Sequence, residues 1–169
     1  LYYIKGGKKN KINILHNNEI LNINQIMEDN MGNLWLATYG NGLFVYDYES
    51  FKNLSKQEGL KSNYCYSIIL GAKNNIWVGH RAGISRIRPD AYVKTYGTKD
   101  GITGDCNMNS IYKDLNGNIW IGTTNGVVKY DYRKDMKNTV PPSVNITDMY
   151  FSSIEVEITD GLEMTYDVY

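Results

Sequence analysis

The sequence predicts an all-β protein built from repeated units of four short antiparallel strands, and three observations support this. The segment GNIWIGTTNG at residues 117–126 recurs as GNLWLATYGNG at 32–42 and as NNIWVGHRAG at 74–83. The tryptophans of the three copies are 42 and 43 residues apart: Trp35, Trp77 and Trp120. Glycine turns and runs of β-branched and aromatic residues surround each copy, which disfavours a helical array. A strand-rich repeat of about 40 to 50 residues is typical of β-propeller blades.

The first strand of each repeat is expected eight and nine residues before the tryptophan. The residues at these positions are apolar or aromatic: Ile26, Met27, Ile68, Ile69, Ile111 and Tyr112. Three residues earlier stand Ile23, Cys65 and Met108. This pattern predicts a buried first strand, with Cys65 as a small apolar core residue. Cys106 falls in a polar loop, so a bridge between the two cysteines is left open but is not supported by the pattern.

A turn follows the first strand and has its own residue pattern. In the outer repeats it contains Asp29 and Asp114, whose carboxylates can bond their own backbone, with Gly32 and Gly117 three residues later. Glycine adopts a positive φ there without steric cost. The middle repeat has Asn74 in place of glycine, and asparagine is the next most tolerant residue for that conformation.

The second strand places each tryptophan between aliphatic residues, so both of its faces are apolar. We therefore expect all three tryptophans to be buried between neighbouring blades. Burial of one ring is worth at most roughly 4 to 6 kcal/mol. Third strands are expected at residues 43–46, 84–87 and 127–130, after a second glycine turn, and more polar fourth strands at 51–55 and 92–96.

The two ends of the chain differ from the repeats. Residues 1–19 are interpreted as the tail of a preceding blade, because the run at 1–4 parallels that at 43–46. The composition changes after Met136, where Pro141 and Pro142 make a stiff extended joint. Alternating apolar residues at 144–146 and 154–158 then predict half-buried strands.

Composition excludes several classes of function. The 18 Lys and Arg residues balance 18 Asp and Glu residues, so the chain is not expected to bind nucleic acid through charge. No apolar run approaches the ~20 residues of a membrane-spanning helix, and no signal peptide is present. Because the chain begins at Leu1 within a strand-like run, we interpret it as an excised piece, which would meet a membrane only through an absent downstream helix.

Catalytic patterns are poorly represented. The two histidines, His16 and His80, form no cluster at metal-ligand spacing, so neither a metal nor a cofactor is expected. The segment 40–42 is followed by Val45 where a dinucleotide fingerprint needs glycine, which indicates a hairpin. No serine has the glycine frame of a nucleophile elbow. We therefore expect no enzymatic activity in this fragment.

The string I-x-x-D-x-x-G-N-I-W-I-G-T-x-x-G-V-x-x-Y-D at residues 111–131 resembles the two-component regulator propeller repeat. That repeat is typical of the periplasmic sensor regions of hybrid two-component systems in Bacteroides-type bacteria. The resemblance covers residues 20–139, and residues 140–169 resemble the linker and first strands of the YYY-type, Ig-like β-sandwich that follows such propellers. The expected domains are therefore propeller blades over 1–139 and the start of a sandwich over 140–169.

The resemblance implies a periplasmic sensor anchored in the inner membrane. Such proteins bind a glycan or oligosaccharide and pass a rearrangement through a membrane helix to a histidine kinase and a fused DNA-binding regulator. None of those later parts lies in these 169 residues, so the kinase activity would belong to the full-length protein. A protein interaction scaffold and a propeller lyase stay open as alternatives, because a propeller fold implies no single function.

Candidate ligand residues lie in the loops between second and third strands, which gather on one face of a propeller. They are Tyr39, Asn41, His80, Arg81, Thr124 and Asn125. Arg81, Arg86 and Arg88 suit the carboxylate or sulfate of an acidic sugar, or they form a solvated strand edge. Tyr39, Tyr64 and Tyr66 stack on sugar rings, or they pack as ordinary strand residues.

The number of repeats also predicts self-association. Three repeats and a remnant do not close a ring, which needs at least four blades. The open arc would expose strand edges and apolar faces, so we expect a homodimer in which two copies complete a pseudo-propeller.

Overall fold

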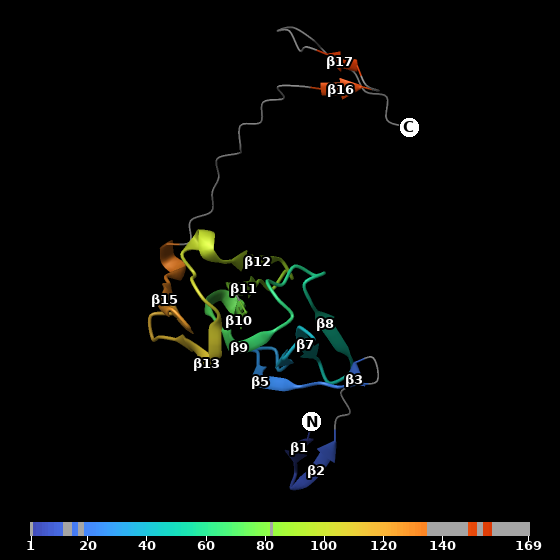
Figure 1. The fold of residues 1–169 in the computed structure, drawn as a ribbon. Helices are drawn as coiled ribbons and strands as arrows, with labels where there is room; N and C mark the ends of the chain where they lie inside the picture. Colours follow the sequence, from blue (N-terminus) through green and yellow to red (C-terminus); the bar gives the residue numbers. More distant parts are fainter. Residues whose placement is uncertain are drawn as a thin grey trace. The chain divides into compact units, whose positions relative to one another are not determined.

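The computed structural model describes residues 2–11, 15–16, 19–81, 83–134, 149–151 and 154–156. The chain divides into two compact units, Leu1–Asp135 and Met136–Tyr169. The regular structure in the described residues consists of strands and three short 3₁₀ helices, so the all-β prediction is confirmed (Figure 1). None of the described helices is long and apolar enough to cross a membrane.

Three antiparallel sheets follow one another in the first unit and correspond to the three repeats. Blade 1 contains β5 (Ile23–Glu28), β6 (Leu34–Thr38), β7 (Leu43–Tyr46) and β8 (Phe51–Leu54). Blade 2 contains β9 (Cys65–Leu70), β10 (Ile76–His80), β11 (Gly83–Ile87) and β12 (Val93–Tyr96). Blade 3 contains β13 (Cys106–Lys113), β14 (Ile119–Thr123) and β15 (Gly126–Tyr130). The first two sheets have the predicted four strands, and the third has three within the described part of the chain.

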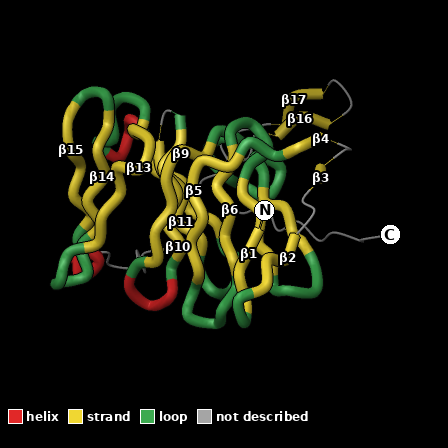
Figure 2. The backbone as a smooth tube through the Cα atoms, turned by 90° about the horizontal axis from the view of Figure 1, so that it is seen from below, coloured by secondary structure: helices red, strands yellow, loops and turns green. Residues whose placement is uncertain are grey.

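The blades lie side by side and contact one another through their first strands. Strand β9 contacts both β5 and β13, so the first strands of the three blades adjoin (Figure 2). The 3₁₀ helices η1 (Ala72–Asn74), η2 (Thr98–Asp100) and η3 (Tyr132–Lys134) lie in connections outside the sheets. In the turns after the first strands, Gly32, Asn74 and Gly117 have φ values of 86°, 57° and 81°. These are the left-handed conformations expected at the repeated turn position.

The core lies between neighbouring blades, and only part of the predicted burial is correct. Trp77 is 2% exposed in the cluster between blades 2 and 3, and Trp35 packs partly buried against the cluster between blades 1 and 2. Trp120 is 37% exposed, so the expectation that it is buried between blades is wrong for the described residues. Its sheet is the last of the described blades. The row of Tyr112, Trp120 and Lys129 therefore has no further sheet against it within the described residues of the first unit.

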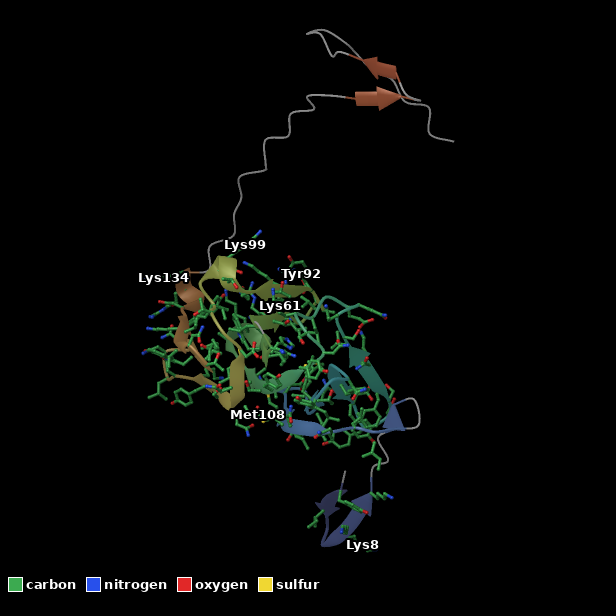
Figure 3. All side chains as sticks on the ribbon, in the orientation of Figure 1. Lys8, Lys61, Tyr92, Lys99, Met108 and Lys134 are labelled. Carbon is green, nitrogen blue, oxygen red and sulfur yellow. The ribbon has the colours of Figure 1, made fainter. Side chains whose placement is uncertain are left out.

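The prediction of a buried first strand holds best for blade 2. Cys65 and Ile68 are 0% and 1% exposed on β9. On the outer blades, Ile26 is 43% exposed and Met108 is 57% exposed, with Met108 at the molecular surface (Figure 3). Strand β9 lies against β5 of blade 1 on one side and β13 of blade 3 on the other. Strands β5 and β13 each lie against β9 on one side.

Both cysteines are free and buried. Cys65 is fully buried, as its repeat position predicts. Cys106 is 3% exposed and begins β13, so its placement in a polar loop is wrong. Burial raises the pKa of the Cys65 thiol to about 12 and that of Cys106 to about 11.

The segments outside the blades form short pairs. Strands β1 (Tyr2–Lys5) and β2 (Lys8–Lys11) make a hairpin, and β3 (Leu15–His16) pairs with β4 (Glu19–Ile20). In the second unit, β16 (Met149–Phe151) pairs antiparallel with β17 (Ile154–Val156), where the alternation predicts a strand. The strand predicted at 144–146 lies outside the described residues, and the sandwich stays a prediction.

Candidate ligand-binding face

The turns that follow the second strands lie at one end of the blades and are bonded to the segments that lead into the first strands. Tyr39 N–H donates to the Asn22 carbonyl at 2.9 Å, and Gly42 N–H donates to the Asn63 carbonyl at 2.9 Å. In blade 3, Thr124 N–H donates to the Asp105 carbonyl at 2.9 Å. We call this end the loop face, and define it by Asn22, Tyr39, Asn41, Asn63, Tyr64, Tyr66, Arg81, Asp105, Thr124 and Asn125.

Three tyrosines from blades 1 and 2 form a ring cluster on the loop face. The Tyr39 and Tyr64 ring centroids are 5.0 Å apart at an interplanar angle of 79°. Tyr39 and Tyr66 are 6.2 Å apart at 30°. Tyr39 remains 46% exposed and Tyr64 37% exposed, so these rings pack against each other while still offering surface to a ligand.

A charged pair lies beside the tyrosine cluster. Arg81 Nε is 3.8 Å from Asp105 Oδ2, and both side chains are largely exposed. Burial raises the pKa of Tyr66, Tyr39 and Asp105 raise it further, and Arg81 opposes them. The Tyr66 hydroxyl is therefore influenced by both the tyrosines and the charged pair. Asp105 is not among the residues predicted from the sequence, where its only signal is its place directly before a first strand.

His80 does not reach the loop face surface, which corrects its prediction as a ligand residue. Its side chain is 0% exposed, with Nε2 2.9 Å from Ser85 Oγ and Nδ1 3.6 Å from Cys65 Sγ. Burial lowers the pKa of His80 to about 4, so the ring is neutral at neutral pH. His80 ends β10 at the position that Thr38 and Thr123 occupy in the sister blades, and those residues are also buried.

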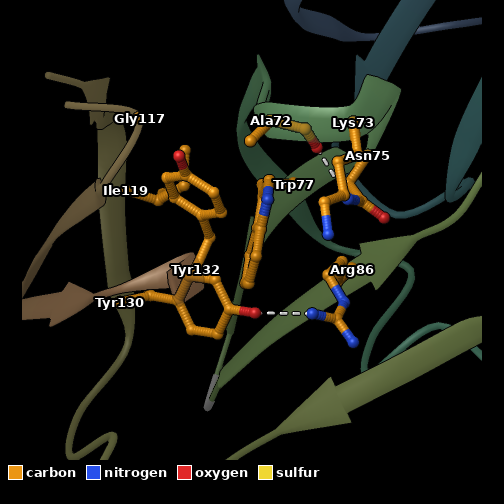
Figure 4. Close-up of a pocket in the computed structure, with 9 residues that line it drawn as sticks. All are labelled: Ala72, Lys73, Asn75, Trp77, Arg86, Gly117, Ile119, Tyr130 and Tyr132. Atoms are coloured by element: carbon orange, nitrogen blue, oxygen red, sulfur yellow. Dashed lines mark hydrogen bonds between the residues drawn. The ribbon is translucent and has the colours of Figure 1, made fainter. Parts of the chain in front are cut away.

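The predicted arginine cluster is not present, because its members lie in different places. Arg86 points into a crevice between blades 2 and 3, where Nη1 donates to Tyr130 Oη at 2.6 Å (Figure 4). Arg88 bonds both Asp90 carboxylate oxygens, at 3.1 and 2.8 Å. Of the three arginines, Arg81 alone belongs to the loop face.

The remaining candidates contribute polar groups at the rim of the loop face. Thr124 Oγ1 accepts the Asp105 N–H at 3.2 Å, and the Thr124 and Asn125 side chains are exposed. Asn41 is partly buried, and its N–H donates to Thr38 Oγ1 at 3.2 Å. Within the described part of the chain, no three His, Cys, Asp or Glu side chains lie close enough to hold a metal ion.

Two segments of the chain match a known family of repeats. Residues 16–40 and 101–125 match the family described as the two component regulator propeller. These segments include the turn and tryptophan of blade 1 and those of blade 3.

Solved structures with a similar fold include extracellular domains of hybrid two component systems. The extracellular domain of a hybrid two component system from B. thetaiotaomicron has a TM-score of 0.68 and 26% identity, over 82% of this chain and 21% of that one. A second such domain from the same organism has a TM-score of 0.55 and 29% identity, over 64% of this chain and 16% of that one.

A curated relative is the histidine kinase P4 of Formosa agariphila, which is 28% identical over 135 residues. The match covers 78% of this chain, and the chain spans 10% of the length of that relative. Virginiamycin B lyase from Staphylococcus aureus has a TM-score of 0.54 at 19% identity, over 75% of this chain and 46% of the lyase, and so shares the fold alone. Two segments of the chain therefore match the two component regulator propeller, and the chain is similar over most of its length to the extracellular domain of a hybrid two component system.

Proposed function

We propose that the chain is part of the periplasmic sensing region of a hybrid two-component histidine kinase, and that its loop face binds an oligosaccharide. The observation that carries this proposal is the cluster of Tyr39, Tyr64 and Tyr66 beside the pair of Arg81 and Asp105. Partly exposed aromatic rings offer apolar faces to the C–H surface of a sugar ring. Tyrosine hydroxyls, the guanidinium and the carboxylate supply donors and acceptors for sugar hydroxyls.

The chemistry of the loop face suits binding better than turnover. His80, the histidine of this region, is buried, and its pKa of about 4 makes it a poor base at neutral pH. Asp105 Oδ2 lies 3.8 Å from Arg81 Nε, and both side chains are exposed to a ligand at the surface. The same groups remain suitable as hydrogen-bond partners for a neutral or weakly acidic sugar.

The position of the loop face also suggests how binding produces a signal. Tyr39 belongs to blade 1, Tyr64 and Arg81 to blade 2, and Asp105 and Thr124 to blade 3. A ligand that contacts all three blades stabilises one arrangement of them over others. We propose that this rearrangement passes through the sandwich predicted at 140–169 to a downstream membrane helix and the kinase.

A glycan array probed with the intact extracellular region tests the proposal. Binding of at least one oligosaccharide is expected, and Tyr39→Ala and Arg81→Ala should each weaken it by about tenfold or more. Tyr92→Ala is the matched control, because Tyr92 is also exposed, at 53%, but lies outside the loop face. Equal binding in all variants, or kinase output unchanged by deletion of the propeller, would refute the proposal. Capture of a protein by the same tyrosines would favour the interaction scaffold instead.

A further inference from the structure

Each pair of neighbouring blades encloses a crevice at the end opposite the loop face. The crevice between blades 2 and 3 has a volume of about 70 Å³ (Figure 4). The crevice between blades 1 and 2 has a volume of about 310 Å³. The larger volume lies at the lower end of the range of sites that bind small molecules, about 300 to 1,000 Å³.

The two crevices are equivalent parts of the repeat. Trp35 and Trp77 lie at the same position of their blades, and the strand register pairs them with Val45 and Arg86, respectively. On the opposite wall, Ile76 pairs with Ile87 in blade 2 as Ile119 pairs with Tyr130 in blade 3. Every residue that lines the small crevice has a counterpart in the large one at the same position of the repeat. The pairs that differ most in size are Arg86 and Val45, Tyr130 and Ile87, and Tyr132 and Pro89.

Three of these pairs account for the difference in volume. In the small crevice, the Tyr130 ring lies 4.4 Å from the Trp77 ring, and its hydroxyl accepts a hydrogen bond from Arg86. Tyr132 adds a second ring beside them (Figure 4). In the large crevice, the corresponding residues are Val45, Ile87 and Pro89, which are smaller. The large crevice therefore has no aromatic ring against its tryptophan. It also lacks the hydrogen-bonded pair that holds such a ring in the small crevice.

The walls and mouth of the large crevice define what can replace that ring. The walls are apolar: Trp35, Val45, Leu54, Leu70, Ile76 and Ile87. At the mouth, Asn30 Nδ2 donates to Asn74 Oδ1 at 2.6 Å, which links blade 1 to blade 2. Asp29 and Asp47 also line the crevice, and each accepts hydrogen bonds from its own turn, which occupies its oxygens but leaves it negatively charged.

One cation at the mouth is available to a ligand. Arg88 is held by both oxygens of Asp90. Lys52 is exposed, lies next to Val45 in the strand register, and has no ion pair within the described part of the chain. An anionic group at the mouth would therefore meet the Lys52 ammonium.

We propose that the crevice between blades 1 and 2 binds a small aromatic carboxylate. Its ring lies against Trp35 as the Tyr130 ring lies against Trp77, and its carboxylate bonds Lys52 at the mouth. The ring gains from apolar burial and from stacking on the indole, and the charged group selects acids over neutral analogues. This site is independent of the loop face and of the sugar that the loop face is proposed to bind.

Calorimetric titration of the intact protein with 3-phenylpropionate and with its neutral amide tests the proposal. We expect saturable binding of the acid and weaker binding of the amide. The double variant V45R/I87Y places the natural contents of the small crevice in the large one, and should abolish binding of both. Lys52→Met should lower the affinity for the acid by about tenfold and leave that for the amide unchanged. Lys94→Met, at the corresponding position of blade 2, is the matched control and should change neither.

The outcomes separate this proposal from a structural effect and from the loop face. Thermal unfolding checks that each variant folds; if the double variant does not, Ile87→Tyr alone serves as the filled crevice. Tyr39→Ala should leave binding of the acid unchanged. Absence of binding at millimolar acid, or equal binding by wild type and filled variants, would overturn the proposal.

Discussion

The indole N–H of Trp120 donates a hydrogen bond to Asp114, with Nε1 2.9 Å from Oδ2. The same carboxylate accepts the backbone N–H groups of Asn116 and Asn118, both at 2.9 Å. Asp29 does the same in blade 1, where Trp35 Nε1 is 2.8 Å from its Oδ2. The repeated aspartate therefore joins the turn to the tryptophan of the following strand.

This bond predicts an acid-sensitive contribution to stability. The Trp120 hydrogen bond, followed by that of Asn118, lowers the pKa of Asp114 from 3.8 to about 2. Because the folded pKa is the lower one, the contribution is fully present above about pH 3.8 and is lost as the pH falls towards 2. Asp114→Asn should lower the melting temperature at pH 7 and flatten its dependence on pH in that window. Equal slopes for wild type and variant, measured by circular dichroism, would contradict the assignment.

His80 predicts a second dependence on pH in a different window. Burial lowers its pKa from 6.5 to about 4, so the unfolded chain binds the proton more tightly than the folded one. The stabilising contribution is complete above about pH 6.5 and falls as the pH drops to 4, by roughly 3 kcal/mol in total. His80→Gln should remove this dependence while the Asp114 effect at lower pH persists. Urea unfolding at intervals between pH 7 and 4 measures it.

The sequence was sufficient for features that repeat and insufficient for contacts between blades. The tryptophan spacing correctly placed β6, β10 and β14, because strand and turn preferences are local. It did not distinguish Trp77, at 2% exposed, from Trp120, at 37%, since burial depends on whether another sheet follows. The burial of His80 was accessible from the repeat register, which aligns it with Thr38 and Thr123. The pairing of Arg81 with Asp105 was not, because it depends on how blades 2 and 3 approach.

The bond between Arg86 and Tyr130 predicts a measurable link between blades 2 and 3. Tyr130→Phe keeps the ring against Trp77 but removes the hydroxyl that accepts from Arg86 Nη1 at 2.6 Å. We expect a loss of about 1 to 2 kcal/mol in the free energy of unfolding. Tyr132→Phe is the matched control, because the Tyr132 hydroxyl makes no hydrogen bond to the described residues, and should change little. A double-mutant cycle with Arg86→Met should give a coupling of about 1 kcal/mol, and zero coupling would show that the bond does not link the blades.

The glycine at position 71 predicts that introducing the aspartate of the other two blades would destabilise blade 2. Gly71 stands where the other blades have Asp29 and Asp114, but a Cβ atom there would lie 2.6 Å from both Cδ1 and Nε1 of Trp77. Trp77 has little room to move, because it is 2% exposed and packs against the Tyr130 ring. Gly71→Asp should therefore reduce the free energy of unfolding by about 1 to 3 kcal/mol, although it restores the repeated aspartate.

Asn74→Gly is the control for Gly71→Asp, since it also moves blade 2 towards the repeat pattern. Asn74 has a φ of 57°, which glycine adopts freely, and its bond to Asn30 is exposed. Its effect should stay within about 0.5 kcal/mol, in line with other surface substitutions. Chemical denaturation of both variants distinguishes a steric conflict with Trp77 from a turn that tolerates no substitution. A Gly71→Asp variant as stable as wild type would show that the indole can shift and donate its N–H to the new carboxylate, as the tryptophans of blades 1 and 3 do.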